Sequence, residues 1–277
     1  MSLVIVALAS KHRKESLLAP AFESLLGWTL EVADFDTDSL GTFTGDVPRL
    51  RSPMETVLAK ARAGALAVGV SQGLASEGTI GPHPAIPFVT VTRELVAFVD
   101  IATGVQVVES VVSSNIHAIS ETWSDGTSLP SLAERADFPR HAVIVRTAGS
   151  EGPVIVKGIR SSEKLAQAIE LCRRAGEGSD VVIETDYRAM ECPSRQAIIR
   201  ECAWKLARRL TQKCSRCGTR GWGVVDVEFG VECGGCHTIS PDAIRADIEG
   251  CAGCDFRVVL PRETKSIDPA WCNVCNP

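Results

Sequence analysis

Hydrophobic and polar positions alternate in short blocks over residues 1–212, as expected where strands and helices take turns along a chain. Short apolar runs predict strands, and apolar residues that recur every three or four positions predict helices. The expected strands cover 3–9, 29–34, 73–76, 142–145, 154–157 and 181–185, with a hairpin-like set over 88–112, and the expected helices cover 14–27, 52–69, 163–175 and 194–212. This order predicts an α/β fold, a mixed twisted sheet flanked by helices.

The clearest boundary is the start of the helix at 52–69. Ser52 is expected at the N-cap, Pro53 at the first helical position and Glu55 at the third, which is the pattern of a capping box. Glu55 therefore has a structural explanation beside the catalytic one considered below.

Cysteine spacing marks a second region. Of 11 cysteines, eight form four Cys-x-x-Cys pairs near the C-terminus: Cys214/Cys217, Cys233/Cys236, Cys251/Cys254 and Cys272/Cys275. The first and second pairs are separated by 15 residues (218–232) and the third and fourth by 17 (255–271), which is typical of four-cysteine zinc sites. We expect two structural Zn²⁺ ions in a double zinc-ribbon module. The 14 residues (237–250) between the second and third pairs leave a cross-braced pairing open.

The pattern divides the chain near residue 213. An α/β domain is expected over 1–212 and the zinc module over 213–277. His237 is an alternative zinc ligand beside Cys236, whereas Cys172, Cys192 and Cys202 match no site and are expected to pack in the core.

Composition excludes some classes of protein. The chain has 29 Lys and Arg against 34 Asp and Glu, a net charge of −5, so it has no overall basic field for nucleic acid. The apolar run at 3–9 is too short to span a bilayer, and its basic residues follow it, the reverse of a signal peptide. These features predict a cytoplasmic protein with no membrane partner.

Polar residues at the ends of two predicted strands are candidates for chemistry. Residues 10–14, Ser-Lys-His-Arg-Lys, place a hydroxyl and several cations at the start of a helix, an arrangement that can bind phosphate. A charged helix start that is only exposed to solvent has the same pattern. Glu77 ends a strand with no capping role, where an α/β enzyme would hold Mg²⁺. His83, in a Gly-Pro-His-Pro turn, is a candidate substrate contact.

Several ordered segments resemble the inosine/xanthosine triphosphatase superfamily. They are residues 10–14, 45–48, 52–63, 77–78, 98–100 and 184–188, followed by Arg195. The resemblance implies a metal-dependent hydrolase that releases pyrophosphate or phosphate from a nucleoside triphosphate or related nucleotide. With segments 76–84 and 272–277, the chain also resembles a bacterial family defined as a domain of unknown function with a C-terminal zinc-ribbon tail.

The superfamily resemblance also implies roles for individual residues. Glu55 and Glu77 would hold Mg²⁺ or Mn²⁺, and Asp100 or Asp186 would orient the attacking water. The phosphate-binding set would be Ser10, His12, Lys14, Arg188 and Arg195. His12 departs from the usual asparagine, and the zinc tail is not part of the usual enzymes.

The alternative is a zinc-ribbon protein without enzymatic activity that binds nucleic acid or a protein partner. The last predicted helix and its end carry a basic set: Arg195, Arg200, Lys205, Arg208, Arg209 and Lys213. The tail from 213 onward has seven basic and nine acidic residues, a net charge of −2, which disfavours electrostatic binding of nucleic acid by the tail. The sequence also leaves open whether the chain forms a homodimer.

Overall fold

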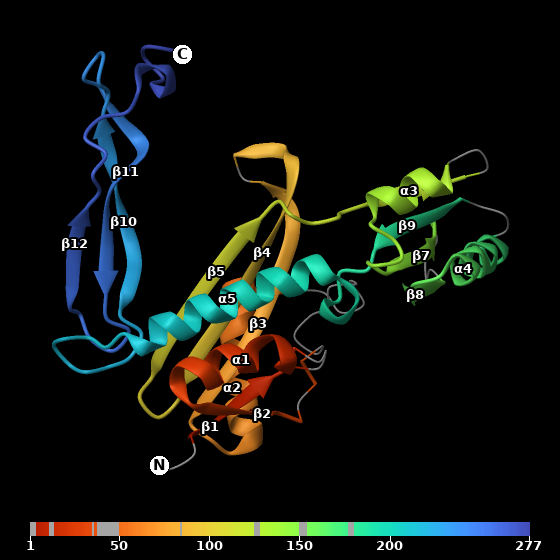
Figure 1. The fold of residues 1–277 in the computed structure, drawn as a ribbon, viewed down its shortest axis with the longest axis horizontal. Helices are drawn as coiled ribbons and strands as arrows, with labels where there is room; N and C mark the ends of the chain where they lie inside the picture. Colours follow the sequence, from red (N-terminus) through yellow and green to blue (C-terminus); the bar gives the residue numbers. More distant parts are fainter. Residues whose placement is uncertain are drawn as a thin grey trace.

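The computed structural model describes residues 4–10, 14–34, 36–37, 50–83, 85–124, 128–149, 154–176 and 180–277. Over these ranges it confirms a mixed α/β fold, with three sheets and five α-helices (Figure 1). The first sheet has the order β2-β1-β3-β4-β5. Its strands are β1 (Val4–Ala9), β2 (Trp28–Val32), β3 (Gln72–His83), β4 (Ile86–Asp100) and β5 (Val105–Ser113).

The first sheet combines two kinds of pairing. β1 is parallel to β2 and to β3, whereas β3, β4 and β5 form an antiparallel meander. Ala9, the last residue of β1, pairs with Ala75, so β3 continues past the end of β1. The strand expected over 73–76 is longer than predicted, because pairing with β4 keeps the chain extended as far as His83.

Helices cover both faces of the first sheet. Alternate residues of β4 point to opposite faces: Val96 and Phe98 lie in one core cluster, and Leu95 and Ala97 lie in another. Helices α1 (Glu15–Leu26) and α5 (Pro193–Thr211) pack on the face of Phe98. Helix α2 (Pro53–Val68) packs on the face of Leu95.

A second sheet lies beside the first and has a core of its own. It is antiparallel, with the order β6-β9-β7-β8. Its strands are β6 (Ser120–Trp123), β7 (Val143–Thr147), β8 (Ile155–Ile159) and β9 (Val181–Thr185), and helices α3 (Leu129–Arg135) and α4 (Ser162–Ala175) pack against it. The strands expected at 142–157 and 181–185 therefore belong to a separate sheet, which the alternation pattern does not distinguish from the first.

The C-terminal region projects from the other side of the molecule (Figure 1). We call residues 213–277 the zinc arm. Its three antiparallel strands are β10 (Gly223–Glu232), β11 (Ile239–Gly250) and β12 (Arg257–Pro261), with β11 in the middle. Throughout the described ranges, no helix has the length and apolar character needed to cross a membrane.

Candidate functional site

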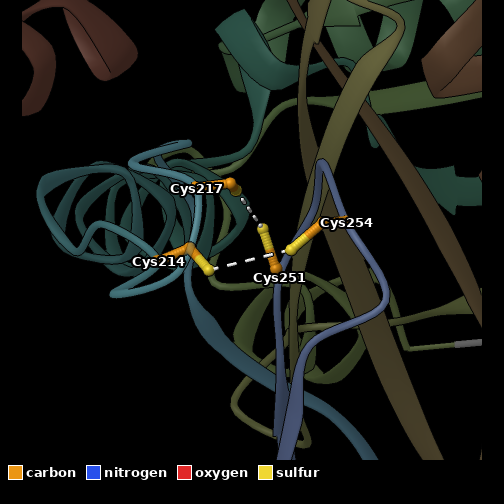
Figure 2. Close-up of side chains that lie close together, drawn as sticks. All are labelled: Cys214, Cys217, Cys251 and Cys254. Carbon is orange, nitrogen blue, oxygen red and sulfur yellow. Dashed lines mark hydrogen bonds between the residues drawn. The ribbon is translucent and has the colours of Figure 1, made fainter.

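The eight paired cysteines gather into two groups of four. The first group is Cys214, Cys217, Cys251 and Cys254 (Figure 2), and the second is Cys233, Cys236, Cys272 and Cys275. Within each group all the Sγ atoms lie within 4.8 Å of one another. Four thiolates so arranged are the donor set of a structural zinc site, so the arm could hold two Zn²⁺ ions. The pairing is cross-braced, first pair with third and second with fourth.

The strands of the arm impose this pairing. β10 carries the chain away from the first cysteine pair to the second, and β11 returns it to the third. At about 3.4 Å per residue, the 10 residues of β10 separate the two groups by about 30 Å. Sequential pairs therefore lie at opposite ends of the arm and do not share a metal.

Backbone N–H groups support the sulfur atoms. Gly253 N donates to Cys251 Sγ at 3.2 Å, and Gly235 N donates to Cys233 Sγ at 3.4 Å. Such bonds favour thiolates, the form that binds metal. His237 lies outside the cysteine groups, and its Nδ1 is 2.6 Å from Glu232 Oε1.

The remaining three cysteines lie in the cores. Cys172, Cys192 and Cys202 are buried, and burial raises the pKa of each thiol, that of Cys202 to about 12. Thiols that resist ionisation in apolar surroundings are unreactive packing residues, as expected from the sequence.

A group of charged side chains, buried except for the half-buried Lys14, lies at the carboxyl end of β1, beside β3. We call Lys14, Lys60, Glu77, Glu94 and Arg195 the charged cluster. Lys60 Nζ on α2 is 2.7 Å from Glu77 Oε2 on β3. Arg195 on α5 reaches Glu94 on β4 twice, with Nε 2.5 Å from Oε1 and Nη2 3.0 Å from Oε2. The Lys60–Glu77 pair lies on the α2 face of the sheet and the Arg195–Glu94 pair on the α5 face. The two pairs are close enough for Glu77 to raise the pKa of Arg195.

Lys14 brings a third cation to the cluster. It lies directly before α1, and its Nζ donates to Ser76 Oγ at 3.0 Å, while its backbone N donates to Ser10 Oγ at 3.3 Å. Burial and, to a smaller extent, the nearby Arg195 lower the pKa of Lys14 to about 8, against the opposing effect of Glu94. Lys14 is therefore a cation in surroundings that disfavour its charge.

A glycine makes room for the Arg195–Glu94 pair. Gly78 lies directly across from Glu94 in the register of β3 and β4. A Cβ atom at Gly78 would lie 2.6 Å from Arg195 Nη2 and 2.6 Å from each Glu94 carboxylate oxygen. Any side chain at this position would push the two charged groups apart.

Four residues expected from the sequence meet at this site: Ser10, Lys14, Glu77 and Arg195. Glu55 is exposed and accepts hydrogen bonds from Ser52 N at 2.9 Å and Ser52 Oγ at 2.7 Å. These bonds lower the pKa of Glu55 and complete the expected capping box. His12 lies outside the described residues.

Other expected site residues lie elsewhere. Asp186 and Arg188 pair with each other, Oδ2 to Nη2 at 2.5 Å, and Asp186 also accepts from Gly158 N at 3.0 Å in the second sheet. Asp100 is six residues beyond Glu94 along β4, about 20 Å away, at the opposite end of the first sheet. His83 Nδ1 accepts from Ala85 N at 3.1 Å, a contact within its own turn.

Sequence reasoning missed Lys60 and Glu94 as site residues. Lys60 is 8% exposed and lies on the buried side of α2, next to Ala61. Glu94 is fully buried, one residue before the apolar run 95–99 of β4. The available signal was a charged residue on the apolar face of a helix or in a buried strand, because such charges need a partner.

A second polar chain, also missed, holds the start of α5. His141 Nδ1 lies 2.9 Å from Asp137 Oδ2, and its Nε2 lies 3.0 Å from Ser194 Oγ and accepts from Ser194 N at 3.1 Å. Burial lowers the pKa of His141, which favours the neutral ring that this acceptor role needs. Because Nε2 accepts a backbone N–H from the first turn of α5, His141 caps this helix one residue before Arg195.

Comparison with known proteins gives a family without an assigned activity. No curated protein and no solved structure shows a significant match to the chain. The resemblance to inosine/xanthosine triphosphatases has no support from these comparisons and stays a prediction. The family described as Domain of unknown function (DUF6671) matches residues 60–277. This match takes in β3, β4, α5 and both cysteine groups, and because it covers most of the chain, the protein belongs to that family.

Proposed function

We propose that the charged cluster binds the phosphate groups of a nucleotide and that the protein hydrolyses it, releasing phosphate or pyrophosphate. An arrangement of the first sheet like that of the inosine triphosphatases is part of the proposal. The supporting observation is the balance of charge among the described residues, because three cations and two carboxylates lie near the carboxyl end of a parallel strand. In open α/β sheets this is the usual place for a ligand.

The excess positive charge favours an anionic ligand. In the described part of the chain, Lys14 Nζ has a hydroxyl partner and no carboxylate within 4.0 Å. A phosphate oxygen beside Lys14 would supply the missing negative charge through a charge-assisted hydrogen bond. It would also oppose the effects of burial and of Arg195 on the Lys14 pKa.

The cluster also offers groups for hydrolysis. We propose that a water oxygen attacks phosphorus while Glu77 accepts the proton of that water and the bond to the leaving phosphate breaks. Lys14 and Arg195 would stabilise the charge that develops on the phosphate oxygens. Lys60, 2.7 Å from Glu77, would fix the orientation of the carboxylate.

The cluster does not fit a dedicated Mg²⁺ or Mn²⁺ site. Glu77 is paired with Lys60, and both oxygens of Glu94 are paired with Arg195. A divalent cation prefers carboxylate oxygens that are free to bind it. Magnesium therefore enters the proposal only as the counterion of the nucleotide substrate, and no step depends on a protein-bound ion.

Nucleic-acid binding through α5 is less well supported. Arg195 is buried, and Lys205 and Arg209 both pair with Glu109, at 2.9 and 2.8 Å. In the arm, Trp222 Nε1 donates to Glu249 Oε2 at 2.7 Å, so this ring has an internal role. The cations of α5 that are available for a nucleic acid are therefore fewer than the sequence indicates.

Product release tests the proposal. Zinc-loaded protein is incubated with standard and deaminated nucleoside triphosphates, with and without Mg²⁺ or Mn²⁺, and phosphate and pyrophosphate are measured. We expect turnover of at least one nucleotide and a loss of about 100-fold or more in Glu77→Gln. Glu201→Gln, an exposed position on α5, is the matched control and should keep full activity. Absence of turnover across the panel, or equal turnover by a folded Glu77→Gln protein, would contradict the proposal.

A further inference from the structure

A cavity of about 320 Å³ lies at the opposite end of the first sheet from the charged cluster. Its wall combines apolar side chains, including Val4, Phe98 and Val105, with polar groups from two parts of the molecule. Gln72 and Asp100 come from directly opposed positions of β3 and β4. Arg220 comes from the turn that follows Cys217 in the zinc arm, so the cavity lies where the arm meets the sheet.

Two opposite charges line this cavity without pairing. Among the described residues, which include both Asp100 and Arg220, no ion pair within 4.0 Å joins these two. Asp100 Oδ1 accepts from Ala102 N at 3.0 Å, and Arg220 Nη1 donates to Leu210 O at 3.2 Å. Each charged group thus has one backbone contact and retains capacity for another partner.

Gln72 adds an unsatisfied acceptor. Its Oε1 is buried and has no hydrogen-bond partner among the residues that the structure describes. Buried polar atoms are nearly always hydrogen-bonded, because an unmade bond loses the hydration of the atom without replacement. A ligand with an N–H donor would satisfy this atom.

We propose that the cavity binds a free α-amino acid with an apolar side chain. The ammonium group would donate to Asp100 and Gln72 Oε1, and the carboxylate would accept from Arg220. The apolar side chain would contact Phe98 and Val105. A volume of about 320 Å³ is at the small end of the range for small-molecule sites. A zwitterion matches two unpaired opposite charges better than a ligand of one sign does.

This site is separate from the proposed hydrolytic site. Asp100 lies about 20 Å along β4 from Glu94, so loss of one activity does not imply loss of the other. Because Arg220 belongs to the arm and Asp100 to the sheet, the bound molecule would connect the two parts.

The test is calorimetric titration of the zinc-loaded full chain with a panel of free amino acids, at up to roughly 10 mM for weak binders. We expect one or more apolar amino acids to bind, and the N-acetyl and methyl ester derivatives, each lacking one charge, to bind at least about tenfold more weakly. Asp100→Asn and Gln72→Leu should weaken binding to a similar extent. Gln106→Leu, an exposed glutamine on the adjacent β5, should leave it unchanged.

Zinc content and the melting temperature without ligand identify variants that have lost their fold. If Gln72→Leu unfolds, Asp100→Asn is the decisive variant, because asparagine keeps the shape of the aspartate side chain. The proposal is overturned if no amino acid binds, or if the single-charge derivatives bind as well as the zwitterion. Equal binding by a folded Asp100→Asn protein overturns it as well.

Discussion

Arg195 and Glu94 form the most buried ion pair of the charged cluster. Their side chains are 1% and 0% exposed, and both carboxylate oxygens of Glu94 contact the guanidinium. Burial of two charges has a high desolvation cost, so such a pair adds little net stability, but removal of one partner leaves the other charge unpaired. We infer that the role of this ion pair is to position Arg195 in the proposed phosphate site.

Substitution of Gly78 tests the packing around this pair. We expect Gly78→Ala to lower the free energy of unfolding by about 1–3 kcal/mol, because its Cβ would lie 2.6 Å from Arg195 Nη2 and from both Glu94 oxygens. Gly81→Ala, in the same strand, meets no atom within 4 Å and is the control. Urea unfolding measures the free energy of unfolding of both variants. Equal stability of the two variants would show that the pair tolerates separation.

At the residue scale, the members of the charged cluster identified from the sequence were those next to predicted element ends. Ser10 and Lys14 lie between a strand and a helix, where ligands bind in α/β proteins. Glu77 was identified at the end of the strand expected over 73–76, although β3 continues to His83. Lys60 and Glu94 are within elements, and their partners come from other elements more than 15 residues away. The local pattern of residues along the sequence does not show which distant residues form ion pairs.

Among the elements, α2 agrees closely with its prediction, β3 is longer than predicted, and β6 and α3 were not predicted. Ser52, Pro53 and Glu55 mark the start of α2, and Gly69 ends it in a left-handed conformation with φ 78°. In β3, the expected strand covered only 73–76, and Gly78, Gly81 and Pro82 beyond it are residues typical of turns, but the chain pairs with β4 as far as His83. Antiparallel pairing with a long neighbour outweighs the local preference of these residues for turns.

The zinc arm shows why cysteine spacing gave the sites but not their pairing. Both sequential separations fit a four-cysteine site, and the cross-braced alternative stayed open. The extended conformation of β10 and β11 decides between the two pairings, because it places successive cysteine pairs at opposite ends of the arm. Strand length, a property of the element, thus determines which pairs meet.

Double substitutions distinguish the two pairings. Cys214→Ser with Cys251→Ser removes two ligands from one site, so we expect about one bound zinc per chain. Cys214→Ser with Cys233→Ser removes one ligand from each site, so both should bind zinc weakly. Zinc content after dialysis against a mild chelator measures this. Sequential pairing would give the opposite result for the two proteins.

At the scale of the whole molecule, α5 connects all three sheets. Its start is capped by His141 from the second sheet, and its middle packs on the first. Near its end, Arg209 Nε donates to Gly221 O of the zinc arm at 3.0 Å, and its Nη1 lies 2.8 Å from Glu109 on β5. The sequence predicted this helix within one residue at each end, but not that it serves as the common contact of three sheets.

The central claim is that the charged cluster binds phosphate, and Lys14 offers a direct test. Its pKa falls from 10.5 to about 8, so the unfolded chain binds more protons above pH 8. Without an anion, this group therefore raises stability as pH increases from about 8 to 10.5. Only protonated Lys14 attracts phosphate, so anion affinity should fall over the same range.

The measurement is calorimetric titration with inorganic pyrophosphate between pH 7 and pH 10. We expect the wild-type affinity for pyrophosphate to fall as pH rises above about 8. Lys14→Arg should retain affinity to higher pH, because a guanidinium stays charged. Lys14→Met should bind at least about tenfold more weakly, whereas Lys164→Met, at an exposed position on α4, should match the wild type. Equal affinity of wild type and Lys14→Met at pH 7 would contradict the claim that this cluster is a phosphate site.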